Sequence, residues 1–306
     1  MNSLLAELLG HLKDPSVPCL VVYHGNCVDG FSAAYAAWSC LGPRARYLPI
    51  VHGQTLPAEL ETLEDGIVLM LDYCLPQPLL GRVVAKARLA VLLDHHASND
   101  ARAAPLLQRR QLKGFLDTGH SAAILAWQFF RPDVPLPVIF EYAEDLDFWC
   151  WRQPQSALVA NALASYPKTF ATWQRLSTLT RSEVRALLAK EGEIIQRYQD
   201  QLIAELADAA RYEHFLGIKV PVVNAPVLLF SPLGDRFTQE HPFFVGYADM
   251  PGYRAFGLRS SESGMDVKAL CMRLGGGGHA RAAGCELSFD HLDPVSGMPG
   301  ANAQGE

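Results

Sequence analysis

The first half of the chain alternates short, unbroken apolar runs with segments of helical periodicity. Three runs, CLVVY (19–23), IVLMLDY (67–73) and LAVLLDHH (89–96), lack the alternation of a strand that exposes one face. Strands that are apolar on both faces and separated by helices are typical of a parallel sheet covered on both sides. The intervening helices are expected at residues 32–41, 79–87, 121–130 and 138–149. The sequence therefore predicts an α/β fold for this half.

Residues 180–212 differ in character from the segments before them. Their Leu and Ile residues and their charges recur at helical spacing, the segment contains no proline, and Gly192 is its one glycine. We interpret it as a long helix or helical pair that joins two domains, with Ser182 as the expected N-cap. The alternative is a core helix of a single domain.

The second half is expected to be rich in strands. They are predicted at residues 218–225, 226–232, 243–250 and 253–261, followed by a helix at 267–273. The predicted organisation is a first domain over residues 1–180, a helical linker over 181–212, a smaller mixed-sheet α/β domain over 213–290 and a tail over 291–306. The tail is expected to be disordered, because its Pro, Gly, Asn and Ser residues have little to bury.

Composition narrows the class of protein. The 306 residues suffice for two domains, and the formal net charge is -6. This charge argues against an extended cationic surface for long duplex nucleic acid, whereas a short anionic substrate held by a few basic residues or by metal ions fits it. The seven cysteines form no C-x-x-C pair and indicate neither a disulfide framework nor a structural zinc site. Without a signal peptide or an apolar run near the roughly 20 residues of a membrane span, we expect a cytoplasmic protein with no membrane partner.

Acidic and imidazole side chains follow each of the three predicted parallel strands. They are His24, Asp29, Asp72, Asp94, His95 and His96. The carboxyl ends of parallel strands meet at one edge of the sheet, which is where open α/β folds bind ligands. Clustered carboxylates raise one another's pKa and usually imply bound cations, and imidazole with carboxylate suits Mn2+ better than Mg2+. The alternative for each single Asp is a turn or helix-cap residue at the start of a loop.

A glycine run lies near the end of the predicted second domain. In GGGGHARAAG (275–284) the backbone can approach a ligand closely and offer N–H groups to an anion. The small residues after His279 are expected to begin a helix, whose dipole favours negative charge. Arg259 and Arg281 are the nearby candidates for phosphate contact, and the alternative for the run is a flexible loop.

Five segments carry a resemblance to a known family. They are YHGNCVDGFSAAYAAW (23–38), LDY (71–73), LLDHHAS (92–98), YAEDLDFW (142–149) and GGGGHARAAG (275–284). In this order they resemble the DHH phosphoesterase superfamily with a C-terminal DHHA1 domain. The combination of Asp-His-His with four glycines and a histidine makes the resemblance specific. It implies a parallel-sheet catalytic domain followed by a smaller domain that closes over the substrate.

The same resemblance implies a site with two divalent ions, Mn2+ or Mg2+. The imidazole ligands favour Mn2+, and Mg2+ or Co2+ are the alternatives. The implied metal ligands are His24, Asp29, Asp72, His95 and one Asp of the segment EDLD. Asp72 would bridge the two ions, and Asp145 fits the family position better than Asp147. His96 would face the substrate phosphate, and Asp94 would hold an imidazole in its tautomer. The implied substrate-binding residues of the second domain are Arg259, Gly275, Gly276, Gly277, Gly278 and His279.

Cys27 departs from the family pattern. The first motif usually reads D-x-D-G, whereas this chain has Cys27-Val28-Asp29-Gly30. A Cys27 thiolate could bind metal and would favour a softer ion than a carboxylate does. The alternative is a small residue packed beside the site, and both interpretations stay open.

The expected reaction is metal-dependent hydrolysis of phosphodiester bonds in short oligonucleotides by an activated water. No covalent nucleophile is required, and Ser121, which lacks a neighbouring base, is expected to cap a helix. The alternative reactions are those of an exopolyphosphatase, a nucleoside bisphosphate phosphatase or a cyclic dinucleotide phosphodiesterase. A nucleotide-binding regulatory protein is the alternative without catalysis, and a homodimer is compatible with the sequence.

Overall fold

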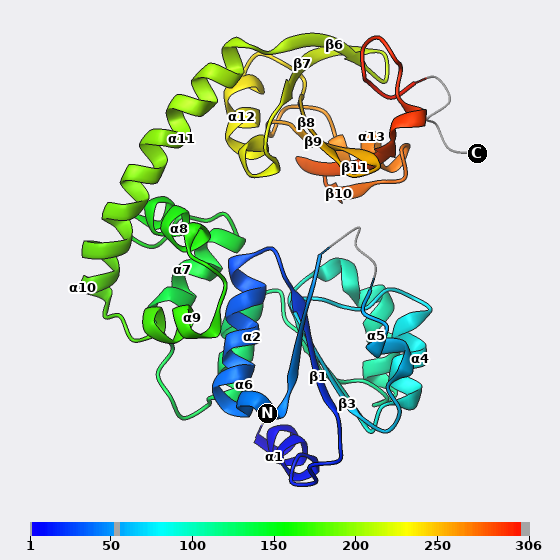
Figure 1. Cartoon of the computed structure of the whole chain (residues 1–306), viewed down its shortest axis with the longest axis vertical. Helices are drawn as coiled ribbons and strands as arrows, with labels where there is room; N and C mark the ends of the chain where they lie inside the picture. Colours follow the sequence, from blue (N-terminus) through cyan, green and yellow to red (C-terminus); the bar gives the residue numbers. More distant parts are fainter. Residues whose placement is uncertain (1, 52–55, 301–306) are drawn as a thin grey trace. The chain divides into compact units, whose positions relative to one another are not determined.

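The chain folds into two compact units, with the boundary between Gln196 and Arg197. The computed structural model describes residues 2–51 and 56–300, and for Asn2, Ser98 and Asp100 it describes the backbone alone. Each unit has its own sheet and its own apolar core (Figure 1). Within the described ranges, no helix combines the length and the apolar composition needed to cross a bilayer.

The first unit contains a five-stranded parallel sheet in the order β2-β1-β3-β4-β5. Its strands are β1 (Cys19–His24), β2 (Arg46–Ile50), β3 (Ile67–Leu71), β4 (Leu89–Asp94) and β5 (Lys113–Leu116). The three apolar runs of the sequence form the three central strands, as predicted. The edge strands β2 and β5 were not predicted, because their mixed polar and apolar residues give no continuous apolar run.

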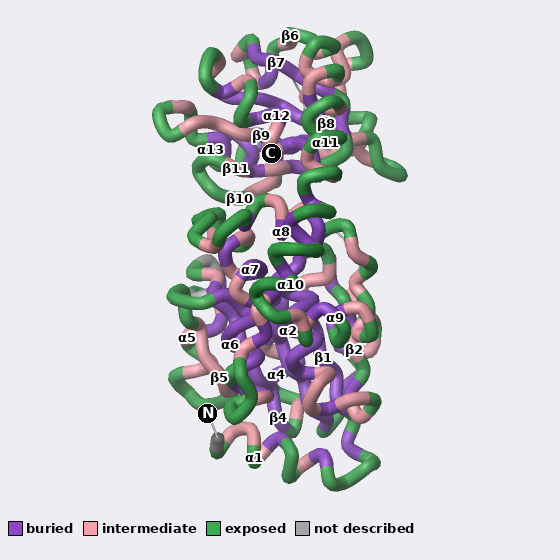
Figure 2. Tube along the Cα trace, turned by 90° about the vertical axis from the view of Figure 1, so that its left-hand side faces the viewer, coloured by how far each residue is buried: buried purple, intermediate pink, exposed green. Residues whose placement is uncertain are grey.

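Helices cover both faces of this sheet. They are α1 (Asn2–His11), α2 (Val28–Leu41), α3 (Glu59–Thr62), α4 (Leu79–Lys86), α5 (Asp100–Gln108), α6 (Ala122–Phe130), α7 (Val138–Asp147), α8 (Ser156–Ser165) and α9 (Phe170–Ser177). Because side chains alternate along a strand, Val21 and Leu69 pack with α2 and α6, whereas Val22 and Met70 pack with α4 on the other face. Figure 1 shows these helices on opposite sides of β1 and β3. The central strands β1, β3 and β4 are accordingly buried, and Figure 2 shows buried chain through the middle of the unit.

A continuous helical run leads out of the first unit. It consists of α10 (Arg181–Glu183), a π-helical stretch (Val184–Ala189) and α11 (Lys190–Asp208). Thr180 is the N-cap and forms a capping box with Glu183, so the expectation of Ser182 at this position is wrong. A Cβ at Gly192 would lie 1.8 Å from the carbonyl oxygen of Leu158, so glycine permits this run to contact α8 closely.

The second unit contains a six-stranded mixed sheet in the order β10-β11-β9-β8-β7-β6. Its elements are β6 (Arg211–Phe215), β7 (Ile218–Asn224), α12 (Phe230–Phe237), β8 (Phe244–Met250), β9 (Tyr253–Arg259), α13 (Val267–Met272), β10 (Gly277–His279) and β11 (Ala282–Ser288). Only the β7–β8 pair is parallel among the described strands of this sheet. The α/β fold with a parallel sheet and a separate mixed sheet is therefore confirmed.

Three local expectations for this unit are wrong. Residues 226–232 form a 3-10 helix (Val227–Leu229) and the start of α12, because Leu229, Phe230 and Leu233 bury one helical face. The residues after His279 form the hairpin of β10 and β11, not a helix start. The expected disorder from residue 291 is wrong up to residue 300, where Leu292 pairs with Pro299 and Met298 is 1% exposed. Residues 301–306 lie outside the described range.

Candidate functional site

The site is built where three parallel strands end side by side. Tyr23 in β1 pairs with Leu71 in β3, and Leu71 pairs with Leu93 in β4. The residues that follow, His24, Asp72 and Asp94, therefore leave the same edge of the sheet. Asp72 adopts a left-handed φ of 56°, a conformation that Asp tolerates better than most residues. The sequence prediction of a common edge follows from this register.

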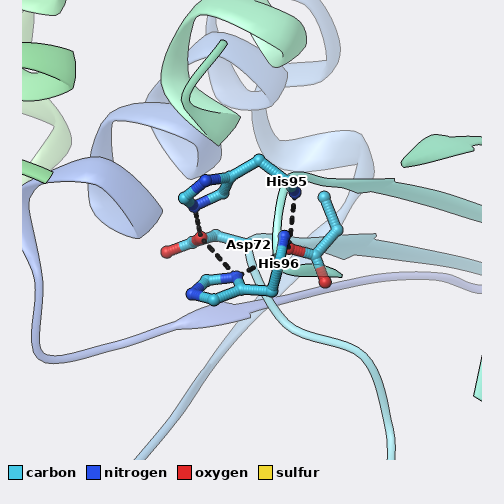
Figure 3. Close-up of side chains that lie close together, drawn as sticks. Asp72, His95 and His96 are labelled. Carbon is cyan, nitrogen blue, oxygen red and sulfur yellow. Dashed lines mark hydrogen bonds and ion pairs between the residues drawn. The ribbon is translucent and has the colours of Figure 1, made fainter. Parts of the chain in front are cut away.

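The Asp72 carboxylate lies at the centre of the group and is 3% exposed. Its Oδ1 lies 3.2 Å from Nε2 of His95 and 3.7 Å from Nδ1 of His96. Figure 3 shows both imidazoles turned toward this carboxylate. Its Oδ2 lies 3.5 Å from Nδ1 of His24 and accepts a hydrogen bond from the Cys27 thiol at 3.2 Å. Both oxygens of Asp72 thus face potential metal ligands, on opposite sides.

His95 is surrounded by three carboxylates. Its Nε2 lies 3.2 Å from Asp72, 3.3 Å from Asp147 and 3.8 Å from Asp29. Burial by itself lowers the pKa of His95, but the three carboxylates raise it to about 9. A nitrogen that attracts a proton this strongly also binds a divalent ion well, because metal and proton compete for it.

Too little positive charge surrounds the carboxylates of Asp29 and Asp147 to compensate their negative charge. Burial, and then the charges of Asp72 and Asp147, raise the pKa of Asp29 well above its usual range. Burial and the charge of Asp72 also raise the pKa of Asp147. Burial opposes ionisation of Asp72 as well, but hydrogen bonds from His24 and His95 hold its pKa low. A cluster in which two of three carboxylates resist ionisation is a site that cations stabilise.

The donor atoms fall into overlapping groups. Asp29, His95 and Asp147 form one group, His24, Cys27 and Asp72 form a second, and within each group the ligand atoms lie within 4.8 Å of one another. Asp72 also belongs to a group with Asp94, His95 and His96, so it lies between the two sets. Oxygen and imidazole donors in this arrangement fit two neighbouring divalent ions of the first transition row.

Asp29 has a second role that the sequence did not reveal. Its carboxylate accepts backbone N–H bonds from Ala122 at 2.9 Å and Ala123 at 3.0 Å, so it caps the N-terminus of α6. Ser121 occupies the N-cap position as expected, but its side chain makes no capping hydrogen bond among the described residues. Asp29 therefore ties the first turn of α2 to α6, which fixes its carboxylate beside His95.

Asp94 holds His95 and His96 in position through hydrogen bonds. It is fully buried, and its Oδ1 accepts hydrogen bonds from the backbone N–H groups of His95 and His96 at 2.7 and 3.1 Å. The same oxygen lies 2.8 Å from Nδ1 of His96, and Oδ2 accepts from Asn99 at 2.5 Å. This contact favours the tautomer with a proton on Nδ1 of His96, which leaves Nε2 of this partly exposed ring for a ligand.

Cys27 is the N-cap of α2. Its sulfur accepts the backbone N–H of Gly30 at 3.0 Å, and burial together with the charges of Asp72 and Asp29 raises the pKa of its thiol. This environment favours a neutral thiol that donates to Asp72. The sulfur nevertheless belongs to one of the potential ligand groups, so both interpretations of Cys27 stay predictions.

The expected ligand Asp145 does not face this group. Its carboxylate accepts backbone N–H bonds from Arg152 at 2.9 Å and Gln153 at 2.8 Å, and the thiol of Cys150 at 3.1 Å. Asp147, two residues later at the end of α7, faces the site instead, with its Oδ2 3.3 Å from Nε2 of His95. Residues two apart on a helix point about 200° apart, so only one of them can face the site. Asp145 is buried beside Tyr142, which lies three residues earlier on the helix and is also buried.

The glycine segment of the second unit forms a hairpin. A Cβ at Gly276 would lie 2.2 Å from the carbonyl oxygen of Gly284, and Gly278 has a φ of 135°. Glycine is thus required by the backbone here, in addition to any contact with a ligand. Arg259 is bonded to Ser231 at 3.0 Å, and burial lowers its pKa. Arg281 donates to the carbonyl oxygens of Gly264 and Glu262, which gives it a structural role.

Two known proteins are similar to this chain in sequence. No family model matches the chain. It is 25% identical over 290 residues to the uncharacterized protein R106 of Acanthamoeba polyphaga mimivirus, which covers 88% of this chain and 67% of that protein. It is 30% identical over 172 residues to the oligoribonuclease NrnB of Bacillus subtilis (strain 168), which covers 52% of this chain but only 42% of NrnB.

A solved structure extends the comparison to nearly the whole chain. It is the DHH domain of a member of the s1p family of ribosomal proteins, with a TM-score of 0.58 and 15% sequence identity. The match covers 93% of this chain and 89% of that one. At this identity the likeness concerns the fold, and it agrees with a parallel-sheet unit followed by a mixed-sheet unit.

Proposed function

We propose that the chain is a phosphoesterase of the DHH superfamily and that it hydrolyses phosphodiester bonds of short oligonucleotides with the help of divalent metal ions. The similarity to the oligoribonuclease NrnB and to a DHH-domain structure supports this proposal. The observation that carries the proposal is the convergence of Asp29, Asp72 and Asp147 on Nε2 of His95. Three carboxylates around one buried imidazole require positive charge, which bound metal ions would supply. The negatively charged phosphodiester would then be attracted to those ions.

The proposed metal ligands are His24, Asp29, Asp72, His95 and Asp147, with Cys27 as a further candidate. Two divalent ions held there, Mn2+ in preference to Mg2+ or Co2+, would activate a water and neutralise charge on the phosphoryl oxygens. Asp72 has an oxygen toward each group of donors and is proposed to bridge. Asp94 orients His96 and raises its pKa, and the doubly protonated ring is proposed to donate a hydrogen bond from Nε2 to the substrate phosphate.

The second unit is proposed to bind the phosphates or ends of the substrate. Its candidate residues are Arg259, Gly275, Gly276, Gly277, Gly278 and His279. The exposed His279 and the backbone of the glycine hairpin support this role, because N–H groups without side chains in front of them can reach an anion. The low overall charge supports a short substrate, and the similarity to the oligoribonuclease NrnB supports an oligonucleotide.

The proposal is tested by a substrate panel with Mn2+. Purified protein is incubated with pApA, a five-nucleotide RNA, cyclic dinucleotides, nucleoside bisphosphates and polyphosphate, and products are separated by chromatography. We expect pApA and the short RNA to be cleaved fastest. Faster cleavage of polyphosphate, bisphosphates or cyclic dinucleotides would replace the oligonucleotide by that substrate class. Tight nucleotide binding without turnover in any divalent metal would favour a regulatory protein.

The role of Asp72 is tested by Asp72→Asn. We expect turnover to be abolished while the circular dichroism spectrum is kept, because the amide cannot supply two anionic oxygens. Asp133→Asn, at an exposed position, is the matched control and should retain full activity. Retained turnover in Asp72→Asn would contradict the metal mechanism.

A further inference from the structure

The segment that follows α7 presents two tryptophans to the solvent. Trp149 is 56% exposed and Trp151 is 38% exposed. Of the other three tryptophans, Trp127 and Trp173 are buried and Trp38 packs against Phe170. Tryptophan is the largest side chain, and its exposure beside a polar site usually marks a surface that contacts a ligand or a partner.

The backbone holds both tryptophans in an unusual conformation. Trp149 has a φ of 53° and Trp151 a φ of 52°, in the left-handed region that bulky residues rarely adopt. Such conformations persist only where the surroundings impose them, and they are concentrated at functional sites. The rest of the segment offers no glycine to absorb this turn.

Asp145 provides the constraint. Its carboxylate accepts the N–H groups of Arg152 and Gln153 and the thiol of Cys150, and its carbonyl oxygen accepts the N–H of Cys150. These four bonds close residues 145–153 into a loop around one buried carboxylate. Asp145, which the family resemblance implied as a metal ligand, therefore shapes the loop that carries the tryptophans.

The two indoles lie against one another. Their ring centroids are 4.6 Å apart and the ring planes are inclined by 65°, so the edge of one ring meets the face of the other. This contact restrains both rings before any ligand binds. A restrained aromatic pair loses little conformational freedom when a further flat ring packs on it.

The loop that carries the pair begins at a proposed metal ligand, Asp147. Trp149 is two residues after Asp147, so its Cα lies within about 8 Å of the Cα of Asp147. The intervening Phe148 packs on the ring of His95, with 5.5 Å between the centroids. A nucleotide whose phosphate is at the cluster would therefore have its base within reach of this loop.

We propose that Trp149 and Trp151 form a stacking platform for a nucleobase next to the phosphate that is cleaved. This inference rests on the proposed function and adds to it the residues that bind the base of the substrate. A nucleobase is favoured over a protein partner because the loop that carries the rings begins at Asp147 and includes Phe148, which packs on His95. Every base has a flat face that stacks on indole, so the platform would bind bases with little regard to their sequence.

Binding is tested by intrinsic fluorescence. The protein, with Mn2+ held constant, is titrated with AMP and separately with ribose 5-phosphate, which differ only by the base. We expect saturable quenching by AMP and little quenching by ribose 5-phosphate. In the double variant Trp149→Phe with Trp151→Phe, the quenching should disappear while calorimetry still detects AMP binding. The phenyl rings can stack on the base but do not contribute tryptophan fluorescence. Equal quenching by both ligands, or unchanged quenching in the variant, would overturn the platform.

Turnover provides the second measurement. Trp149→Ala and Trp151→Ala are compared with the parent on pApA and on an abasic dinucleotide of the same backbone. Loss of a stacking partner should reduce kcat/KM on pApA by about 5- to 150-fold, mostly through KM, and leave the abasic substrate unaffected. Tyr198→Ala, at a position 62% exposed on α11, is the control and should change neither. Full activity of the Trp variants on pApA would refute stacking.

The two proposals fail in distinguishable ways. If pApA is cleaved but the tryptophan variants match the parent on both substrates, the phosphodiesterase stands and the platform is wrong. If nothing is cleaved but AMP quenches the two exposed indoles and the alanine variants lose AMP binding, the platform stands without the enzyme. A Trp variant that self-associates less in sedimentation and keeps its activity on pApA would show that the pair contacts a second copy of the chain.

Discussion

Gly30 lies in the first turn of α2, where a methyl group has no room. A Cβ at this position would lie 2.3 Å from the carbonyl oxygen of His24 and 2.9 Å from both Oδ2 of Asp72 and the Cβ of His24. Its φ is not in the left-handed region, so helix propensity alone predicts that Gly30→Ala stabilises the protein by about 0.5–1 kcal/mol. Gly30→Ala therefore combines a stabilising effect of helix propensity with a destabilising steric clash.

The contact distances decide which effect is larger. Ordinary carbon–oxygen contacts are about 3.5 Å or longer, so the His24 carbonyl would have to move by roughly 1 Å. Overpacking of this kind costs about 1–3 kcal/mol, and the net change should be a destabilisation of about 0.5–2 kcal/mol. Because the displaced groups are two proposed metal ligands, Mn2+ affinity should fall by about 10- to 100-fold.

Thermal unfolding followed by circular dichroism and calorimetric titration with Mn2+ measure the two effects. Gly10→Ala in α1 is the matched control, because nothing lies within 4 Å of its Cβ, and it should raise the melting temperature slightly. Gly30→Ala should lower the melting temperature by about 1–8 °C. If Gly30→Ala is as stabilising as Gly10→Ala and binds Mn2+ normally, the packing of α2 against Asp72 is not as described.

Two further predictions concern the acidic residues and the pH. Asp147→Asn should weaken Mn2+ binding at least tenfold in calorimetry without loss of stability, whereas Asp145→Asn should destabilise the fold by about 1–3 kcal/mol in urea and leave the ligand set in place. The opposite pattern would return Asp145 to the ligand set. The pKa of His95 is raised to about 9 from an ordinary 6.5, so the stabilisation from its protonated form is complete below pH 6.5 in the metal-free protein and is lost as the pH rises through 9. Urea unfolding in EDTA should show that the free energy of unfolding declines as the pH rises, and His95→Gln should make this decline smaller. Mn2+ affinity should rise over the same pH range, because protons and metal compete for His95. An affinity that does not depend on pH would contradict this competition.

The sequence by itself determined the core of the first unit. β1, β3 and β4 are apolar on both faces, and only a sheet covered on both sides can bury such strands. The polar residues that follow them were therefore predicted to share one edge, and the strand register brings His24, Asp72 and the Asp94–His96 segment together there. These features depend on local pattern and on a general rule of parallel sheets, so no tertiary contact had to be known.

Only the tertiary structure decided which neighbouring side chain does what. Asp145 and Asp147 are equally acidic and two residues apart, and the choice between them depends on where α7 ends relative to His95. Likewise, the small residues after His279 suit a helix start or a hairpin, and the pairing of β11 with β9 selects the hairpin. The left-handed turns that expose Trp149 and Trp151 depend on a buried carboxylate that accepts distant backbone N–H groups. Tertiary packing brings the residues in such contacts together, and the pattern of apolar and polar residues along the chain does not specify that packing.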